Sequence, residues 1–235
     1  MTPADPVVFL IDVDNTLLDN DRIRDDMQAY LKGEFGPAGE RYWAIQERLF
    51  VDLGYRDYLG AVQQHRFEHP DDDPLFSMSS YLLDYSFADR LYPGALDVLR
   101  RFGAWGRTVI LSDGDVVFQP RKIERSGIGA AVSGRYLVYV HKEQALDDVE
   151  RRYPARHYVL VDDKLRILTA AKQYWGARVT TVFPRQGEMA HDPAALGSFP
   201  AADLSVEHIG DLIDVDREAL LPFHLSIQAT TTVTR

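Results

Sequence analysis

A short apolar run near the N-terminus ends abruptly in two carboxylates, and this feature constrains the fold more than any other. The run, Val-Val-Phe-Leu-Ile at residues 7–11, contains three β-branched residues and no polar one. A continuous run of this kind suits a strand that is covered on both faces, as in a parallel sheet. Asp12 and Asp14 follow at once. Ligands of open α/β sheets bind beyond the carboxyl ends of the strands, so we expect both acids at a binding edge.

Further apolar runs repeat this pattern and alternate with helical segments. The runs that indicate buried strands lie at residues 108–111, 136–140, 158–161 and 179–183. The helical patterns lie at residues 94–102, 119–125, 143–152 and 166–175. Alternation of strands and helices predicts an α/β fold: a Rossmann-like parallel sheet with right-handed crossovers and helices on both faces.

Residues 19–90 break the alternation, because this interval contains helix-like segments only. The segments cover residues 21–35, 38–53, 56–67 and 75–87. The interval is too long for a crossover and has apolar residues of its own, so we expect an inserted α-helical cap over the sheet. The expected organisation is a core of residues 1–18 and 91–221, a cap of residues 19–90 and a flexible tail of residues 222–235.

Composition excludes several classes of protein. The absence of cysteine excludes a disulfide framework, a thiolate zinc site and a cysteine nucleophile, and it favours a cytoplasmic location. No stretch reaches the roughly 18 apolar residues of a membrane helix, and the N-terminus lacks the pattern of a signal peptide. A net charge of −10 at pH 7 opposes attraction to nucleic acid and to anionic lipid. The expected partner is therefore a small molecule, with no nucleic acid and no membrane.

Side chains that carry chemistry also follow the other expected strands. Ser112 follows the second run, Lys142 follows the third, and Asp162 and Asp163 end the fourth. Because parallel strands end at one edge of a sheet, we expect these residues and the first acid pair to form one site. Four clustered carboxylates need a cation, since like charges raise each other's pKa. The all-oxygen set of ligands suits Mg²⁺, which is commonly shared with a substrate phosphate.

These residue types together suit phosphoryl transfer. An aspartate beside a cation and a lysine can attack phosphorus and form an aspartyl-phosphate. The leaving alkoxide needs a proton and the hydrolytic water must lose one, which requires a second carboxyl group nearby. The hydroxyl and backbone N–H groups of Ser112, Asp113 and Gly114 are candidates to bind the phosphoryl oxygens, with Gly114 allowing close approach.

At these residues the chain resembles the haloacid dehalogenase-like superfamily, most of whose members are Mg²⁺-dependent phosphatases or phosphomutases. The four motifs of the family occur in order. The Asp-x-Asp-x-Thr motif matches residues 12–16, the hydroxyl matches Ser112, the lysine matches Lys142, and the acid pair matches residues 162–163. The helical insertion matches the cap that many members carry after the first motif.

The resemblance also implies roles for individual residues. It implies that Asp12 is the nucleophile, that Asp14 is the general acid and base, and that Thr16 supports the first loop. Ser112 and Lys142 would hold phosphate and nucleophile. The implied Mg²⁺ ligands are Asp12, the backbone carbonyl of Asp14, and the pair Asp162 and Asp163.

Two local features depart from the pattern of the family. An uncharged residue often follows the hydroxyl, whereas here Asp113 does, and Asp115 adds a second charge that bears on the choice of substrate. Asn15 replaces the frequent glycine after the general acid, and asparagine still permits turn geometry.

Some charged and polar residues have an ordinary structural explanation. His65 and His69 have the spacing of a two-histidine metal site but no evident third ligand, so exposed histidines are expected. Residues 71–73 are three aspartates that suit a solvated loop. Lys164 is expected to be a surface charge. Arg22 and Arg24 are candidates to contact a polar substrate, although exposed helix charges are the commoner explanation.

Several functions remain open at this stage. A phosphatase acting on a small phosphorylated metabolite leads, and a phosphomutase, which returns the phosphoryl group to its substrate, is the nearest rival. A dehalogenase is disfavoured because cleavage of a carbon–halogen bond needs neither the second acid nor a phosphate clamp. A phospho-accepting signalling module would place its acid pair before the accepting aspartate, not last. A non-catalytic binding module would have no need of every catalytic group.

Overall fold

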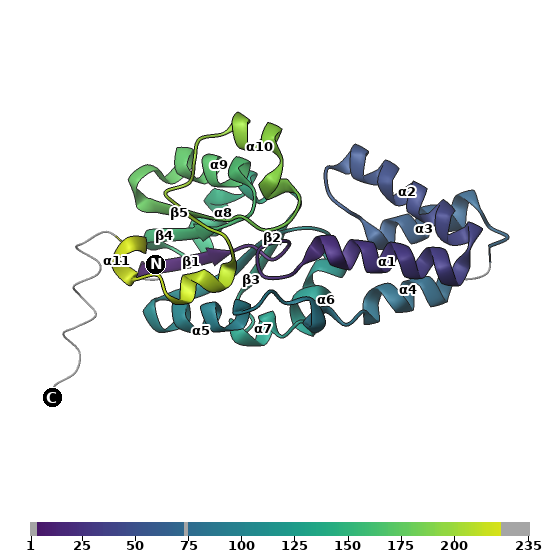
Figure 1. Cartoon of the computed structure of the whole chain (residues 1–235), viewed down its shortest axis with the longest axis horizontal. Coiled ribbons are helices and arrows are strands. Elements are labelled where there is room, and N and C mark those ends of the chain that lie inside the picture. The colour runs from purple at the N-terminus through teal and green to yellow at the C-terminus, as the bar shows by residue number, and fades with distance from the viewer. Residues whose placement is uncertain (1–3, 73–74, 222–235) are drawn as a thin grey trace.

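The structure is a computed structural model of the 235-residue chain and describes residues 4–72 and 75–221. A single sheet of six parallel strands has the order β3-β2-β1-β4-β5-β6 (Figure 1). The strands are β1 (Asp5–Ile11), β2 (Arg107–Asp113), β3 (Tyr136–Tyr139), β4 (Ala155–Val161), β5 (Val179–Pro184) and β6 (Leu204–Val206). The predicted Rossmann-like α/β fold is confirmed, whereas the predicted tail at residues 222–235 lies outside the described residues.

Strand β1 lies in the middle of the sheet and is buried on both faces. Val7, Phe9 and Ile11 belong to one hydrophobic cluster, and Val8 and Leu10 belong to another. Alternate side chains of a strand point to opposite faces, so the two clusters are the two covered faces of the sheet. This arrangement explains why the sequence of β1 is apolar throughout.

Helices cover both faces of the sheet (Figure 1). One face carries α8 (Leu146–Arg152), α9 (Leu165–Trp175) and α10 (Pro193–Ser198). The other carries α5 (Ala95–Trp105), α7 (Ile128–Ala131) and α11 (Arg217–Leu220). Helix α6 (Phe118–Arg125) follows β2 and lies toward the inserted helices.

The sequence patterns missed some boundaries in this part of the chain. Strand β6 was not predicted, because it has only three residues and none of them is fully buried. The segment predicted as one helix at residues 143–152 is a 3-10 turn at Lys142–Gln144 followed by α8. The turn places the side chain of Lys142 inside the protein instead of on a helix surface.

The inserted residues form four helices beside the carboxyl edge of the sheet (Figure 1). They are α1 (Asn20–Phe35), α2 (Pro37–Leu53), α3 (Tyr58–Glu68) and α4 (Leu75–Asp84), followed by a 3-10 turn at Phe87–Arg90. Asp19 and Asp57 cap α1 and α3, since their side chains accept the N–H groups of Arg22 and Gly60. The last predicted helix ends three residues early, at Asp84, and the 3-10 turn at Phe87–Arg90 then leads back to the core.

The two segments that join the inserted helices to the sheet run side by side. Leu18 and Leu91 form an antiparallel bridge, the N–H of Asp19 donates to the carbonyl of Arg90 at 2.8 Å, and the N–H of Tyr92 donates to Leu17 at 2.9 Å. The chain therefore leaves and re-enters the core through one paired connection.

Direct contacts also join the inserted helices to the core. The ring of Tyr58 on α3 lies 4.7 Å from the ring of Phe118 on α6. Arg24 on α1 pairs with Glu188, in the loop after β5, at 3.1 Å. The helices therefore rest on the core at several points beyond the connection.

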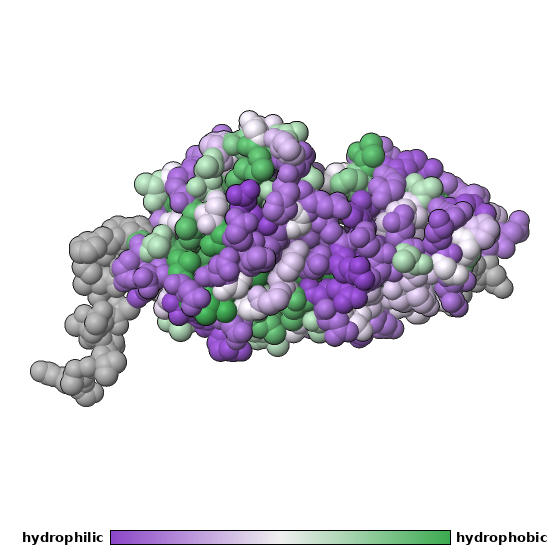
Figure 2. Space-filling view, viewed as in Figure 1, coloured by the Kyte–Doolittle hydropathy of each residue, from purple (hydrophilic) through white to green (hydrophobic). Residues whose placement is uncertain are grey.

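The visible surface is mostly hydrophilic, and apolar residues gather in smaller areas of it (Figure 2). Within the part of the chain that the structure describes, no helix has both the length and the apolar character needed to cross a membrane.

Candidate active site

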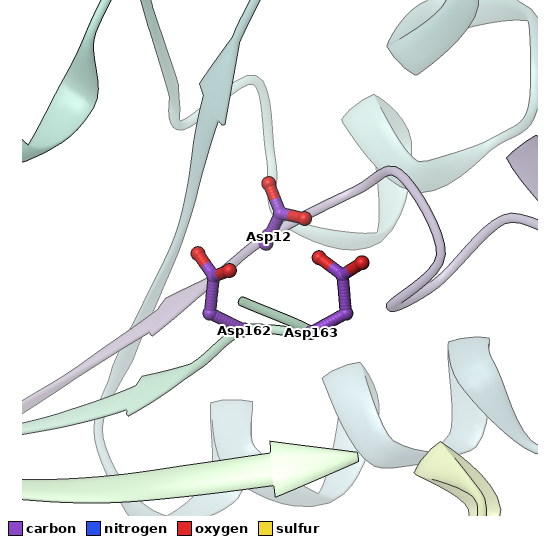
Figure 3. A group of neighbouring side chains, drawn as sticks. All are labelled: Asp12, Asp162 and Asp163. Carbon is purple, nitrogen blue, oxygen red and sulfur yellow. The ribbon is translucent and has the colours of Figure 1, made fainter. Parts of the chain in front are cut away.

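Three aspartates from two neighbouring strands meet at the carboxyl edge of the sheet (Figure 3). Asp12 directly follows β1, and its N–H donates to the carbonyl of Val161 at 3.0 Å. Asp162 and Asp163 directly follow β4. One carboxylate oxygen from each of the three lies within 4.8 Å of the others, and all three residues are buried. The strand register therefore brings residues that are about 150 positions apart in the sequence into one cluster.

Lys142 is the cation that lies deepest in this cluster. Its side chain has no exposed surface, and its Nζ lies 2.5 Å from Asp12 Oδ1 and 2.7 Å from Asp162 Oδ2. Burial alone would lower the pKa of Lys142, but the charges of Asp12 and Asp162 hold this pKa well above its usual range. Lys142 is therefore charged and holds the orientation of both carboxylates.

Asp163 faces the cluster without a partner of its own. Neither of its oxygens has a hydrogen-bond partner among the described residues, although the residue is only 2% exposed. Burial and the charges of Asp12 and Asp162 raise the pKa of Asp163 well above its usual range. Burial also raises the pKa of Asp12, to about 6, against the opposing charge of Lys142. When all three carboxyl groups are ionised, the neighbouring cations do not fully compensate their negative charge, and ionisation of Asp12 and Asp163 is therefore disfavoured.

The donor set of this cluster fits a hard divalent cation. Three buried carboxylates offer oxygens close together, and two oxygens of Asp163 are free to bind. Oxygen ligands of this kind are those that Mg²⁺ prefers. The side chain of Asp14 is outside the group, so a contact from this residue would come through its backbone, as the sequence implied.

The sequence indicated a surface charge at Lys164, and the structure places this residue between surface and interior, because it directly follows the acid pair. Its backbone N–H donates to Asp162 Oδ1 at 2.9 Å. Burial would lower the pKa of Lys164, but the charges of Asp163 and Asp12 raise it above the usual range.

Ser112 lies at the end of β2 and is held by the next helix. Its Oγ accepts a hydrogen bond from Gln119 Nε2 at 2.8 Å and donates to the carbonyl of Asp113 at 3.3 Å. The backbone N–H of Gly114 donates to the carbonyl of Tyr139 at 2.9 Å. This N–H was expected to bind phosphate, but in the structure it is used in a backbone hydrogen bond between the ends of β2 and β3. Gly114 has a φ of 146°, and a Cβ there would lie 2.9 Å from the side chain of Gln119, so glycine is required.

The two acids that depart from the family pattern both have structural partners. Asp113 Oδ1 accepts the backbone N–H of Lys142 at 2.7 Å and so holds the loop that carries the lysine. Burial raises the pKa of Asp113. Asp115 Oδ1 accepts the N–H groups of Val117 and Phe118, at 2.8 and 2.7 Å, and caps the start of α6. Both carboxylates therefore stabilise the backbone around the site by accepting hydrogen bonds from its N–H groups.

Asp14 lies two residues after Asp12, in the loop that leads from β1 to the inserted helices. Its side chain is 25% exposed, and Oδ1 accepts a hydrogen bond from Lys122 Nζ at 2.7 Å. The next residue, Asn15, has a φ of 56°, as its place in a turn requires. Asn15 Oδ1 accepts the N–H groups of Asn20 and Asp21, at 2.9 and 3.2 Å, which fixes the start of α1.

Three residues that the sequence did not single out contact candidate site residues: Gln119, Lys122 and Asn20. Gln119 and Lys122 are three positions apart, so they lie on one face of α6. The available signal was that this helix begins directly after the Ser112 loop and carries two polar residues on the face toward the sheet edge. Both side chains are buried, at 3% and 2% exposure.

The two arginines proposed for substrate contact have carboxylate partners. Arg22 pairs with Asp26 at 3.2 Å and is largely exposed. Arg24 lies near Asp21, Asp25 and Glu188, at 3.4, 3.2 and 3.1 Å. A role for either arginine in substrate binding stays a prediction.

The histidine pair and the acidic run lie elsewhere in the inserted helices. His65 is fully buried, not exposed as expected, and its Nε2 lies 2.8 Å from Asp72 Oδ2. Asp72 also binds Arg41, at 2.5 Å, so it is an ion-pair partner and not simply solvated. The difference arises because Asp72 folds back onto α2 and α3. Asp73 lies outside the described residues.

The chain was compared with protein-family models, curated proteins and solved structures. No protein-family model matched the chain, and a search of curated proteins found no match. A solved haloacid dehalogenase-like hydrolase from Burkholderia xenovorans is similar at 60% identity and a TM-score of 0.87, over 94% of this chain and 100% of that one.

Two more distant structures are similar in fold alone. A HAD-hydrolase from Bacillus subtilis, solved with magnesium, has 14% identity and a TM-score of 0.59, over 89% of this chain and 97% of that one. An L-2-haloacid dehalogenase from Xanthobacter autotrophicus has 16% identity and a TM-score of 0.58, over 88% and 96%.

Proposed function

Because the chain belongs to the haloacid dehalogenase-like hydrolases, we propose that it is a Mg²⁺-dependent phosphatase that hydrolyses a phosphomonoester of a small metabolite. The observation that carries this proposal is the buried cluster of Asp12, Asp162 and Asp163, in which Asp163 has no partner among the described residues. Displacement of halide at carbon does not call for a divalent cation. A phosphate substrate does, because its negative charge must approach an anionic nucleophile.

Asp12 is the proposed nucleophile. Lys142 binds its Oδ1 at 2.5 Å and thereby favours the ionised form that can attack. The carboxylate forms a bond to phosphorus, the bond from phosphorus to the leaving oxygen breaks, and an aspartyl-phosphate results. Water then attacks the same phosphorus, which releases phosphate and restores the Asp12 carboxylate.

Asp14 is the proposed general acid and base. It gives its proton to the leaving alkoxide in the first step and takes a proton from the attacking water in the second. Its side chain is the most exposed of the four acids, as expected for a group that exchanges protons with substrate and water. Cleavage of a carbon–halogen bond would not require this second acid, because a halide ion leaves without a proton.

The remaining site residues would hold the phosphoryl group and a cation. Ser112 Oγ can donate a hydrogen bond to a phosphoryl oxygen. Lys142 Nζ, which lies against Asp12, Asp162 and the carbonyl of Leu111, would contribute its positive charge beside the phosphoryl group. Asp12, Asp162 and Asp163 would hold Mg²⁺, which supplies the positive charge that draws a phosphate ester to the cluster. Gln119 fixes the orientation of the Ser112 hydroxyl.

We propose that residues 19–90 are a cap that admits and selects the substrate, and that residues 1–18 and 91–221 are the catalytic core. The burial of Asp12, Lys142 and Asp163 supports this role, because a substrate reaches them only if some covering part moves. The paired connection between residues 17–19 and 90–92 is the proposed hinge. The Arg24 to Glu188 pair would hold the closed position.

Phosphate release from a panel of phosphomonoesters with Mg²⁺ tests the proposal. We expect release from at least one small phosphorylated metabolite and from an aryl phosphate, and no halide from 2-haloacids assayed in parallel. Net phosphate release also separates a phosphatase from a phosphomutase, which would convert a sugar phosphate to its isomer instead. Halide release without phosphate release would refute the phosphatase assignment.

A further inference from the structure

We propose that Lys122 is a positioning residue, which holds one oxygen of Asp14 so that the other exchanges protons with substrate and water. The inference rests on the proposed function of Asp14. Nothing in the four family motifs includes Lys122, which lies ten residues after Ser112 on α6.

The burial of Lys122 is the first observation. Its side chain is 2% exposed, and its Nζ donates to Asp14 Oδ1 at 2.7 Å and to Asn20 Oδ1 at 2.9 Å. An ammonium group taken out of water costs several kcal/mol unless partners replace the solvent. Buried Lys122 therefore depends on these two partners, of which Asp14 lies at the end of the first core segment and Asn20 at the start of the proposed cap.

The second observation is the position of Lys122 on its helix. Gln119, one turn earlier on α6, donates to Ser112 Oγ at 2.8 Å. Side chains three positions apart lie on one face of a helix, so α6 supports two candidate catalytic groups at once. Asp115 caps the start of this helix through the N–H groups of Val117 and Phe118. The helix is thus held at the end nearest the site.

The chemistry of the contact assigns different tasks to the two oxygens of Asp14. An ammonium group has three hydrogen-bond donors and no acceptor. Oδ1 can therefore only accept from Lys122, whether the carboxyl group is neutral or ionised. When Asp14 carries the proton for the leaving group, that proton lies on Oδ2, and the same oxygen takes the proton of the hydrolytic water. Lys122 thereby fixes which oxygen reacts and the direction in which it points.

Lys122→Met tests this role, because methionine keeps most of the buried volume and removes the donor. We expect kcat for an alkyl phosphate to fall by about 10- to 100-fold, since misplaced acid–base catalysis loses much of its usual contribution. For nitrophenyl phosphate, whose leaving group needs little protonation, we expect the release of nitrophenolate in the first turnover to slow by less than about 3-fold, because this step precedes the attack of water on the aspartyl-phosphate. KM should change little for both esters. Lys122→Gln, which can still donate to Oδ1, should recover most of the lost rate.

A second comparison tests whether Lys122 acts on the rate through Asp14. In an Asp14→Asn background, adding Lys122→Met should change the remaining rate by less than about 2-fold, because the group on which Lys122 acts is already gone. The matched control is Lys172→Met on α9, whose Nζ pairs with Asp203 at 2.7 Å far from the site. Its rates should match those of the unchanged protein.

An equal slowing of alkyl phosphate turnover and of first-turnover nitrophenolate release would overturn the proposal. An undiminished effect of Lys122→Met in the Asp14→Asn background would also overturn it. If Lys122→Met does not fold, the same two esters are compared with the variants Lys122→Gln and Asn20→Ala. We expect smaller losses in these variants, and again a larger loss for the alkyl phosphate than for nitrophenyl phosphate. A crystal structure of the Lys122 variant is independent of activity. A reoriented Asp14 carboxylate supports the proposal, and an unmoved one contradicts it, even if no phosphatase activity is found.

Discussion

Asp12→Asn should lower phosphate release by at least about 10³-fold, because an amide cannot act as the attacking nucleophile. The loss should be the same for alkyl and nitrophenyl phosphate, since no leaving group compensates for a missing nucleophile. The fold should survive, because Lys142 keeps its 2.7 Å contact with Asp162 and asparagine has the size of aspartate.

Thermal unfolding provides the control for this variant. We expect the Tm of Asp12→Asn to be no lower than that of the unchanged protein, because the substitution removes one of several repelling charges in a buried cluster. Turnover at the normal rate by a folded Asp12→Asn protein would exclude covalent catalysis at this position.

Removal of divalent cations should abolish turnover, and added Mg²⁺ should restore it. The cluster of Asp12, Asp162 and Asp163 otherwise repels a phosphate ester. Binding should also stabilise the fold: Mg²⁺ at 100 times its dissociation constant adds about 2.7 kcal/mol. For a chain of this size, that gain raises Tm by roughly 5 to 10 °C.

Asp163→Asn should show whether the rise in Tm comes from Mg²⁺ bound at the aspartate cluster or from a general effect of Mg²⁺ on the protein. This variant should lose most of the Mg²⁺-dependent rise in Tm. In metal-free buffer it should be at least as stable as the unchanged protein, because burial and the charges of Asp12 and Asp162 disfavour the ionised form of this carboxyl group. Asp97→Asn, at an exposed ion pair on α5, is the matched control and should keep the full rise. Full activity in metal-free buffer would contradict a metal role for these acids.

The fold and the position of the acids could be predicted because their signals are local. Each long strand contains an apolar or β-branched run, and in β1 and β4 the run stops at the residue where the strand meets the edge of the sheet. Parallel topology then places Asp12, Asp162 and Asp163 together, whereas the inward position of Lys142 also depends on the 3-10 turn that begins there. The inserted helices could likewise be predicted, because the interval is too long for a crossover and contains apolar residues of its own.

The contacts that orient the acids could not be predicted, because they depend on how distant elements pack. Lys122 on a short helix has the sequence signature of a solvated charge, and only the approach of α6 to the loop after β1 buries it. The same limit applies to Lys164, to His65 with Asp72, and to the backbone contacts of Asp113 and Asp115. Charged residues that find partners across the fold look like surface residues in the sequence.

The covalent intermediate is the most direct test of the phosphoryl-transfer mechanism. In Asp14→Asn, nitrophenyl phosphate should still phosphorylate Asp12, because its leaving group departs without a proton, whereas the hydrolytic water is no longer activated. Acid quenching followed by peptide mass spectrometry should therefore find one phosphoryl group on Asp12 in this variant, and none in Asp12→Asn treated in the same way. An unmodified Asp12 during Mg²⁺-dependent turnover, or a phosphoryl group on another residue, would contradict the mechanism.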